Sequence, residues 1–145
     1  MTAAAQPRNV HWTLLFVSWL IALASTLGAL FFSEVMELAP CVLCWYQRIA
    51  MFPLALMLGI ALLPFDARVV RYALPLAVIG WAIALYHCLL YWGVVPKELV
   101  PCGQGADCTS AQMELAGFVT IPLLSLLAFS AIVFLLLVVR KGVPR

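Results

Sequence analysis

The stretch CVLCWYQRIAMFPLALMLGIALLP, residues 41–64, joins a C-x-x-C pair to a long apolar run. Cys41 and Cys44 form the pair, and Arg48 is the only charged residue in the run from Cys44 to Leu63. A helix needs roughly 20 apolar residues to cross the hydrocarbon core of a bilayer, and this run is long enough. The sequence therefore predicts a redox or metal motif at the start of a membrane helix.

The composition of the whole chain agrees with a membrane setting. Of 145 residues, 66% are hydrophobic and 10% are charged, whereas about a quarter of the residues of a soluble domain are charged. A soluble domain of this size could not bury so many apolar side chains, so lipid must surround the chain. The net charge is only +2, and no basic run interleaved with aromatic residues is present, which argues against nucleic acid as a partner.

Four segments have the length and apolar character of spans, about 12–32, 44–63, 72–92 and 118–139. Backbone groups in lipid must be satisfied within a segment, so we expect helices rather than strands. The first segment is longer than the apolar part of a cleaved signal peptide, and we expect it to be retained. The fold class predicted is an all-α membrane protein, a four-transmembrane-helix bundle that forms a single domain over residues 1–145.

The basic residues predict the orientation of this bundle. With four spans, both termini and the loop 64–71 share one face, which holds six basic residues against one, Lys97, on the other. Basic residues gather on the cytoplasmic side, so the N- and C-termini are expected to be cytoplasmic and the loops 33–43 and 93–117 outside. The six basic residues are Arg8, Arg68, Arg71, Arg140, Lys141 and Arg145.

These outer loops hold four of the five cysteines, Cys41, Cys44, Cys102 and Cys108, on the side where disulfides persist. The residues leave three interpretations open: two structural disulfides, a four-thiolate zinc site, or two exchanging dithiol/disulfide pairs. Zinc ribbons use two C-x-x-C knuckles at closer spacing, and a c-type haem needs histidine where Trp45 stands. Redox exchange is favoured, and no metal is expected.

Local geometry also favours redox chemistry. Pro40 is a plausible helix start, which places Cys41 and Cys44 in or beside the first turn, where free N–H groups and the helix dipole stabilise a thiolate. The spacing i, i+3, i+7 puts Cys41, Cys44 and Arg48 on one helical face. A charge inside a span indicates a functional site, although an arginine near a helix end can also extend to the headgroups.

One histidine lies in the third span, at a depth comparable to that of Arg48 in the second. His87 stands five residues before Trp92 and is either a packing residue or part of the site. Since the other four of the five cysteines form the two pairs, its neighbour Cys88 has no cysteine partner. We expect it to behave as a small buried apolar residue.

Together these motifs resemble one family. CVLCWYQR at the start of the second of four spans, Tyr86-His87 late in the third, and a second cysteine pair in the following loop resemble the DsbB family of disulfide bond formation proteins. The short CGQGADC loop followed by GFVTIP is most similar to its BdbC-type branch. The resemblance covers nearly the whole chain.

The resemblance implies a membrane thiol:quinone oxidoreductase, a quinone-dependent protein-dithiol oxidase of the bacterial cytoplasmic membrane. Electrons would pass from a DsbA-like thioredoxin-fold partner to Cys102–Cys108, then to Cys41–Cys44, then to a membrane quinone, ubiquinone or menaquinone. It also implies that Cys44 meets the quinone beside Arg48, with His87 as a further quinone-binding or proton-donating residue.

Two alternatives stay open from the sequence. One is a quinone-linked enzyme of the vitamin K epoxide reductase kind, in which the C-x-x-C lies late in the bundle. The other is a non-catalytic membrane scaffold that carries two structural disulfides.

Overall fold

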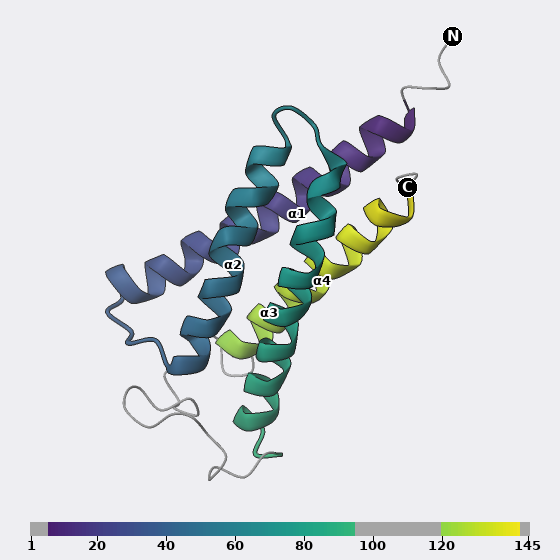
Figure 1. The fold of residues 1–145 in the computed structure, drawn as a ribbon. Coiled ribbons are helices and arrows are strands. Elements are labelled where there is room, and N and C mark those ends of the chain that lie inside the picture. Colours follow the sequence, from purple (N-terminus) through teal and green to yellow (C-terminus); the bar gives the residue numbers. More distant parts are fainter. Residues whose placement is uncertain (1–5, 95–119, 143–145) are drawn as a thin grey trace.

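The computed structural model describes residues 6–94 and 120–142, and four long helices dominate it (Figure 1). A π-helical turn, η1 (Phe31–Val35), extends the first helix, and a 3-10 turn, η2 (Ala67–Val69), precedes the third. These two described ranges contain no β-strand, so the all-α prediction is confirmed. The long helices are α1 (Gln6–Leu30), α2 (Val42–Ala61), α3 (Val70–Tyr91) and α4 (Ile121–Gly142).

All four helices are long and apolar enough to cross a membrane, over Asn9–Val35, Val42–Ala61, Ala67–Tyr91 and Ile121–Gly142. Their outer surfaces carry large apolar side chains, such as Leu56, Ile60 and Phe134, each at least 65% exposed. Exposing apolar surface to water costs about 25 cal/mol per Å², and lipid removes that cost. The predicted four-helix membrane bundle is therefore confirmed.

Capping residues decide where α2 and α4 begin. Pro40 precedes α2, and Cys41 is its N-cap, with extended backbone (φ −71°, ψ 167°) and a sulfur that accepts the Cys44 N–H. At α4 the Thr120 hydroxyl accepts the Leu123 N–H over 3.4 Å. Such side-chain acceptors satisfy N–H groups that have no partner within the helix.

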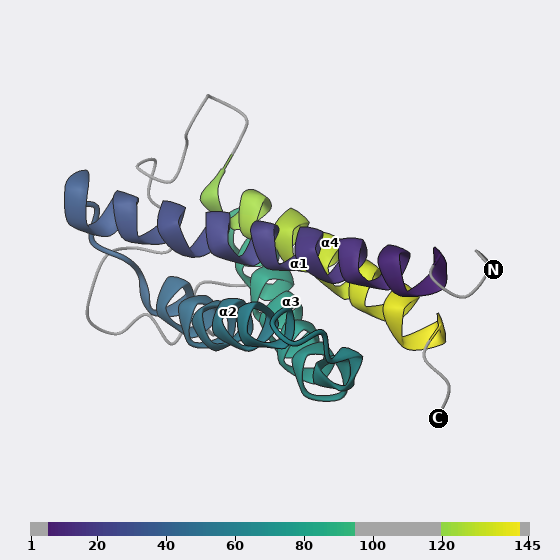
Figure 2. The same ribbon diagram turned by 90° about the horizontal axis from the view of Figure 1, so that it is seen from above.

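Each helix packs against the next one in the chain, and α4 closes the bundle against α1. Figure 2 shows α1 running beside α4 and α2 running beside α3. Helices α3 and α4 approach closely at Gly80, because a Cβ atom there would overlap the Phe129 ring. The Trp81 indole N–H also donates to the Ser130 hydroxyl over 2.9 Å, which ties α3 to α4.

The two ends of the bundle differ in chemistry. At one end lie the α2–α3 turn, the start of α1 and the end of α4, where the His11 ring packs on Gly142 (Figure 1). At the other end, the start of α2 meets the end of α3, and Cys41 and Leu43 form a small buried cluster with Leu90. The C-x-x-C pair therefore lies at the opposite end from the α2–α3 turn.

Candidate functional site

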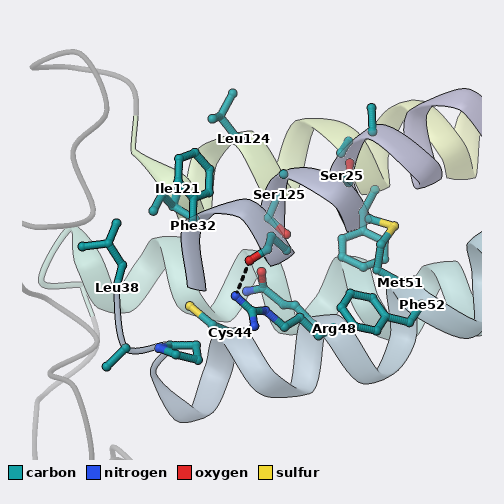
Figure 3. Close-up of a pocket in the computed structure, with 18 residues that line it drawn as sticks. Ser25, Phe32, Leu38, Cys44, Arg48, Met51, Phe52, Ile121, Leu124 and Ser125 are labelled. Carbon is teal, nitrogen blue, oxygen red and sulfur yellow. Dashed lines mark hydrogen bonds between the residues drawn. The ribbon is translucent and has the colours of Figure 1, made fainter. Parts of the chain in front are cut away.

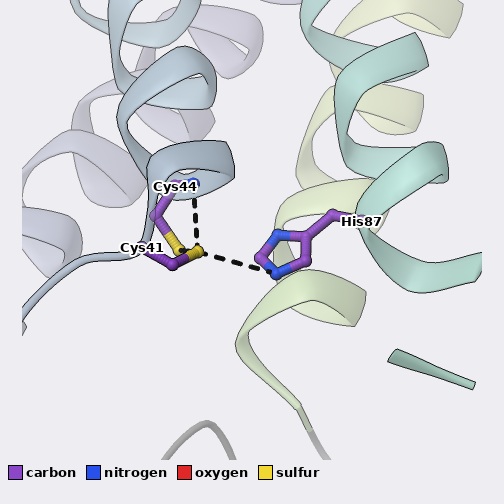
Figure 4. A group of neighbouring side chains, drawn as sticks. All are labelled: Cys41, Cys44 and His87. Atoms are coloured by element: carbon purple, nitrogen blue, oxygen red, sulfur yellow. Dashed lines mark hydrogen bonds between the residues drawn. The ribbon is translucent and has the colours of Figure 1, made fainter. Parts of the chain in front are cut away.

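The two sulfurs of the C-x-x-C pair lie side by side as free thiols. Cys41 Sγ and Cys44 Sγ are 3.0 Å apart (Figure 4). A disulfide bond is about 2.05 Å long, so an approach of roughly 1 Å would join them. The pair is thus arranged for reversible disulfide formation.

Cys41 is fully buried and is surrounded by groups that stabilise a thiolate. Its sulfur accepts the Cys44 N–H over 3.4 Å and lies 3.8 Å from His87 Nε2 (Figure 4). The hydrogen bond with the Cys44 side chain, helped by His87 and the Cys44 N–H, lowers the pKa of Cys41 to about 4, although burial acts to raise it. Cys41 is therefore the member of the pair most readily present as thiolate, and the Cys44 thiol serves as its hydrogen-bond donor.

Cys44 faces a cavity of about 410 Å³ that is enclosed by α1, α2 and α4, which we call the α1–α2–α4 cavity (Figure 3). Most of its wall is apolar, and a few polar side chains lie among the apolar ones. This volume and lining are typical of a site for a small apolar molecule. The wall includes Ser25 and Gly28 of α1, Phe32 of η1, Cys44, Gln47, Arg48 and Met51 of α2, and Ile121, Ser125 and Phe129 of α4.

Arg48 lines the same cavity and also ties α2 to α1. Its Nη2 donates to the Ala29 carbonyl oxygen over 2.8 Å (Figure 3). Its Nη1 donates to the Ser33 hydroxyl over 3.2 Å. Its guanidinium carbon lies 5.5 Å from the centre of the Trp45 ring. The guanidinium carries more N–H donors than these two bonds use. Arg48 is therefore anchored within the protein next to Cys44, whichever role it has.

His87 on α3 lies outside the cavity, next to two of the residues that line it, Cys44 and Gln47. It is fully buried and is not among the residues that line the α1–α2–α4 cavity. Its Nε2 faces Cys41, and its Nδ1 lies 3.1 Å from Gln47 Nε2. Its neighbour Cys88 is a buried free thiol on α3, 2% exposed.

The expectation that Cys41, Cys44 and Arg48 share one face holds for Cys44 and Arg48, which line the cavity. Cys41 caps the helix from outside it, and its sulfur lies toward α3. Cys102 and Cys108, the second predicted pair, lie outside the described residues.

A soft metal ion is the other species that such a cluster could hold. The ligand atoms of Cys41, Cys44 and His87 all lie within 4.8 Å of one another. Two thiolates on one tetrahedral zinc, at about 2.3 Å each, would be about 3.8 Å apart. The observed separation of 3.0 Å between the sulfurs is shorter and suits disulfide exchange better.

Sequence reasoning missed Gln47 and Gly28. Gln47 is a buried polar residue inside a span, 6% exposed. Its polarity is a signal present in the sequence, since a polar side chain inside a span indicates function. A Cβ atom on Gly28 would meet nothing within 4 Å, and no pattern in the sequence indicates that this glycine faces a cavity.

The fold and the site define a class: a membrane-spanning helix bundle that carries a buried C-x-x-C dithiol beside an apolar cavity. More narrowly, the chain belongs to the DsbB family, since the model of the family described as "Disulfide bond formation protein DsbB" matches residues 10–139. The protein is accordingly an oxidoreductase with a role in disulfide bond formation.

Several relatives match over most of their length. A "Probable disulfide formation protein" of Metapseudomonas resinovorans is 52% identical over 137 residues, covering 94% of this chain and 95% of the relative. "Disulfide bond formation protein C" of Bacillus subtilis is 43% identical over 126 residues, covering 87% of this chain and 91% of the relative. The expected likeness to the C-type branch is thus confirmed. No solved structure matches this chain.

Proposed function

We propose that this protein is a thiol:quinone oxidoreductase that reoxidises an extracytoplasmic, DsbA-like thioredoxin-fold thiol oxidase. Electrons would pass from the partner to Cys102–Cys108, then to Cys41–Cys44, then to a membrane quinone. The observation that carries this proposal is the position of Cys44, whose thiol is both adjacent to the Cys41 sulfur and part of the wall of the α1–α2–α4 cavity.

The cavity has the features that a quinone ring needs. Its wall is mainly apolar, and Arg48, Ser25 and Ser125 supply polar atoms that can donate to ring oxygens. A bound quinone would supply the chemistry that the chain lacks, because it accepts two electrons and two protons. The cationic guanidinium of Arg48, which the bonds to α1 hold beside Cys44, would stabilise negative charge at this position.

The two cysteines have different tasks in this proposal. With Cys41 as thiolate, oxidation of the pair forms one S–S bond and breaks the Cys44 S–H bond, and two electrons and one thiol proton leave. The Cys41 thiolate would attack the Cys44 sulfur as an electron pair passes from Cys44 to the quinone on the cavity side, which would take one proton from Cys44 and one from solvent. The low pKa of Cys41, about 4, keeps this attacking sulfur ionised at neutral pH.

The disulfide so formed would then be reduced by the second pair. A thiolate of Cys102 or Cys108 would attack a sulfur of the Cys41–Cys44 disulfide, and the resulting mixed disulfide would resolve to leave Cys102–Cys108 oxidised. That pair would in turn take two electrons from the dithiol of the thioredoxin-fold partner. Membership of the DsbB family supports this order of transfers.

The arrangement of basic residues supports a location in the bacterial cytoplasmic membrane with the thiols outside. Arg68 and Arg71 lie near the α2–α3 turn, and Arg140 and Lys141 lie in the last turn of α4. Both places are at the opposite end of the bundle from Cys41 (Figure 1). Since basic residues favour the cytoplasmic side, the C-x-x-C would face the oxidising side, where disulfides persist.

An anaerobic reconstitution tests the proposal directly. Purified protein is mixed with a soluble quinone and a reduced thioredoxin-fold protein, and quinone absorbance and partner thiols are followed together. We expect one quinone to be consumed for each partner dithiol, and no consumption by a Cys44→Ala variant. A non-catalytic scaffold would leave both signals unchanged, and its disulfides would resist millimolar thiol.

A further inference from the structure

Gln47 connects the helix of the C-x-x-C pair to the histidine beside Cys41. It lies on α2, is 6% exposed, and places its side-chain nitrogen 3.1 Å from Nδ1 of His87 on α3. Both side chains are buried, so each needs a hydrogen-bond partner within the protein. The contact therefore holds the imidazole ring at a set orientation between α2 and α3.

The chemistry of the amide decides which ring nitrogen carries the hydrogen. An amide nitrogen only donates, so a ring nitrogen that faces it must accept. Nδ1 is then without a hydrogen, and the neutral ring carries its hydrogen on Nε2. Nε2 is the atom that lies 3.8 Å from Cys41 Sγ, so its N–H is directed at the sulfur (Figure 4).

We propose that Gln47 is a positioning residue for the reaction: its amide holds neutral His87 with the hydrogen on Nε2, and this N–H stabilises the Cys41 thiolate. This inference rests on the proposed function, because it names the residues that stabilise the Cys41 thiolate, the group that forms the disulfide with Cys44. Gln47 also lies in the wall of the α1–α2–α4 cavity, and the inference concerns its amide, which acts on Cys41 through His87. It also gives His87, which is not among the cavity-lining residues, a task at Cys41.

Few other groups bear on this sulfur. Among the described side chains, Cys44 on α2 and His87 on α3 act on the ionisation of Cys41, and Tyr86 and Tyr91 on α3 pack against the buried cluster that contains it. Cys44 contributes its thiol and its N–H whatever stands at position 47. A change that follows substitution of Gln47 alone therefore reports on the histidine.

The first test needs no substitution in the site. The chain has two histidines, His11 and His87, so a spectrum of protein labelled with ¹⁵N-histidine can be assigned by comparison with His11→Gln. We expect reduced protein at pH 7 to show His87 neutral, with hydrogen on Nε2 and none on Nδ1. Hydrogen on Nδ1 of a neutral ring would overturn the proposal.

The second test measures the thiolate by its reactivity. Fully reduced protein is alkylated with iodoacetamide across pH 3–8, and tandem mass spectrometry separates label on Cys41 from label on Cys44. For Gln47→Leu we expect the midpoint of the Cys41 profile to rise by about 0.7 pH unit, the worth of one hydrogen bond of ordinary net strength, so that Cys41 reacts roughly fivefold more slowly well below the wild-type midpoint. The two rates should converge above about pH 6, where Cys41 is ionised in both proteins.

Two further variants separate positioning from packing. Gln47→Glu supplies a carboxylate that accepts from Nδ1–H at pH 7, so both ring nitrogens should carry hydrogen in the spectrum, and the midpoint of the Cys41 alkylation profile should stay within about 0.3 pH unit of wild type. Ser130→Ala removes a hydrogen bond between α3 and α4 away from the site and should leave the pH profile unchanged.

A wild-type alkylation profile in Gln47→Leu, or an equal loss of Cys41 reactivity in Ser130→Ala, would reduce Gln47 to a packing residue. Neither the spectrum nor the alkylation contains quinone or partner protein. Failure of this inference is therefore distinguishable from failure of the proposed function, which the anaerobic reconstitution measures.

Discussion

The Arg48 guanidinium donates a 2.8 Å hydrogen bond to the carbonyl oxygen of Ala29, across the interface between α2 and α1. Ala29 lies in the last turn of α1, just before the π-helical turn η1. The same oxygen also accepts from the Ser33 hydroxyl over 3.2 Å, and Ser33 in turn accepts from Arg48 Nη1, so the guanidinium joins a hydrogen-bonded cluster where α1 meets η1. A charge close to Cys44 is thereby held in place rather than left free to extend to the headgroups.

Arg48→Lys should raise the apparent KM for quinone about tenfold, because a compact ammonium cannot make the paired donations of the planar guanidinium. Tenfold corresponds to about 1.4 kcal/mol, if KM follows binding. The measurement is quinone-dependent thiol oxidation over a quinone series, for wild type and for the Lys and Gln variants. Unchanged KM and kcat in Arg48→Lys would leave Arg48 with a purely structural role.

Gly28→Leu should block the cavity. A Cβ atom on Gly28 meets nothing within 4 Å, so a leucine there can enter the α1–α2–α4 cavity without displacing the helices. We expect the KM for quinone to rise by more than about tenfold. The matched control is Gly28→Ala, which adds one methyl group and should stay within about twofold of wild type. A Leu variant with normal quinone kinetics would place the quinone elsewhere.

The ionisation of Cys41 should make the stability of the reduced protein depend on pH. Its pKa falls from 9.0 to about 4 on folding, chiefly through the Cys44 side chain. A lowered pKa contributes stability that is complete above about pH 9 and is lost as pH falls toward 4. The advantage in Tm of reduced wild type over Cys41→Ser should therefore grow by a few degrees between pH 5 and pH 8.

This comparison is made by thermal unfolding in detergent with reductant present. The oxidised protein has no thiol at position 41 and is the control, since its Tm should lack this pH dependence. A constant difference between wild type and Cys41→Ser across the range would show that Cys41 stays protonated.

The two cysteine pairs should be functionally distinct. Changing Cys102 or Cys108 to Ala should abolish oxidation of the thioredoxin-fold partner, yet leave oxidation of a small thiol through Cys41–Cys44 largely intact. The assay compares the two thiols with the same quinone. Equal loss of both activities would argue against two successive transfers.

The orientation is tested with maleimides that cannot cross membranes. After reduction, Cys102 and Cys108 should be labelled from the outside of intact cells, because the basic residues favour a cytoplasmic position for both termini. A Cys102→Ala/Cys108→Ala variant gives the background. Labelling found only in inverted vesicles would reverse the orientation and remove the oxidising environment that the proposal requires.

The sequence alone was sufficient to predict the four helices and their location in a membrane. Runs of apolar residues such as 44–63 are long enough to span, and lipid leaves the backbone no alternative to helix. The C-x-x-C pair and its place at the start of α2 also followed from local signals, since Pro40 and a capping side chain act over a few residues. The family resemblance depended on the same local motifs.

Only the tertiary structure decided what each sulfur faces. A helical period relates Cys44 to Arg48, but it cannot direct Cys41, because an N-cap residue has extended backbone and lies outside the helix. The contact of Cys41 with His87, and of His87 with Gln47, joins residues 40 or more positions apart. Such contacts depend on how α2 and α3 pack against each other, and the helical period of either sequence alone does not specify that packing.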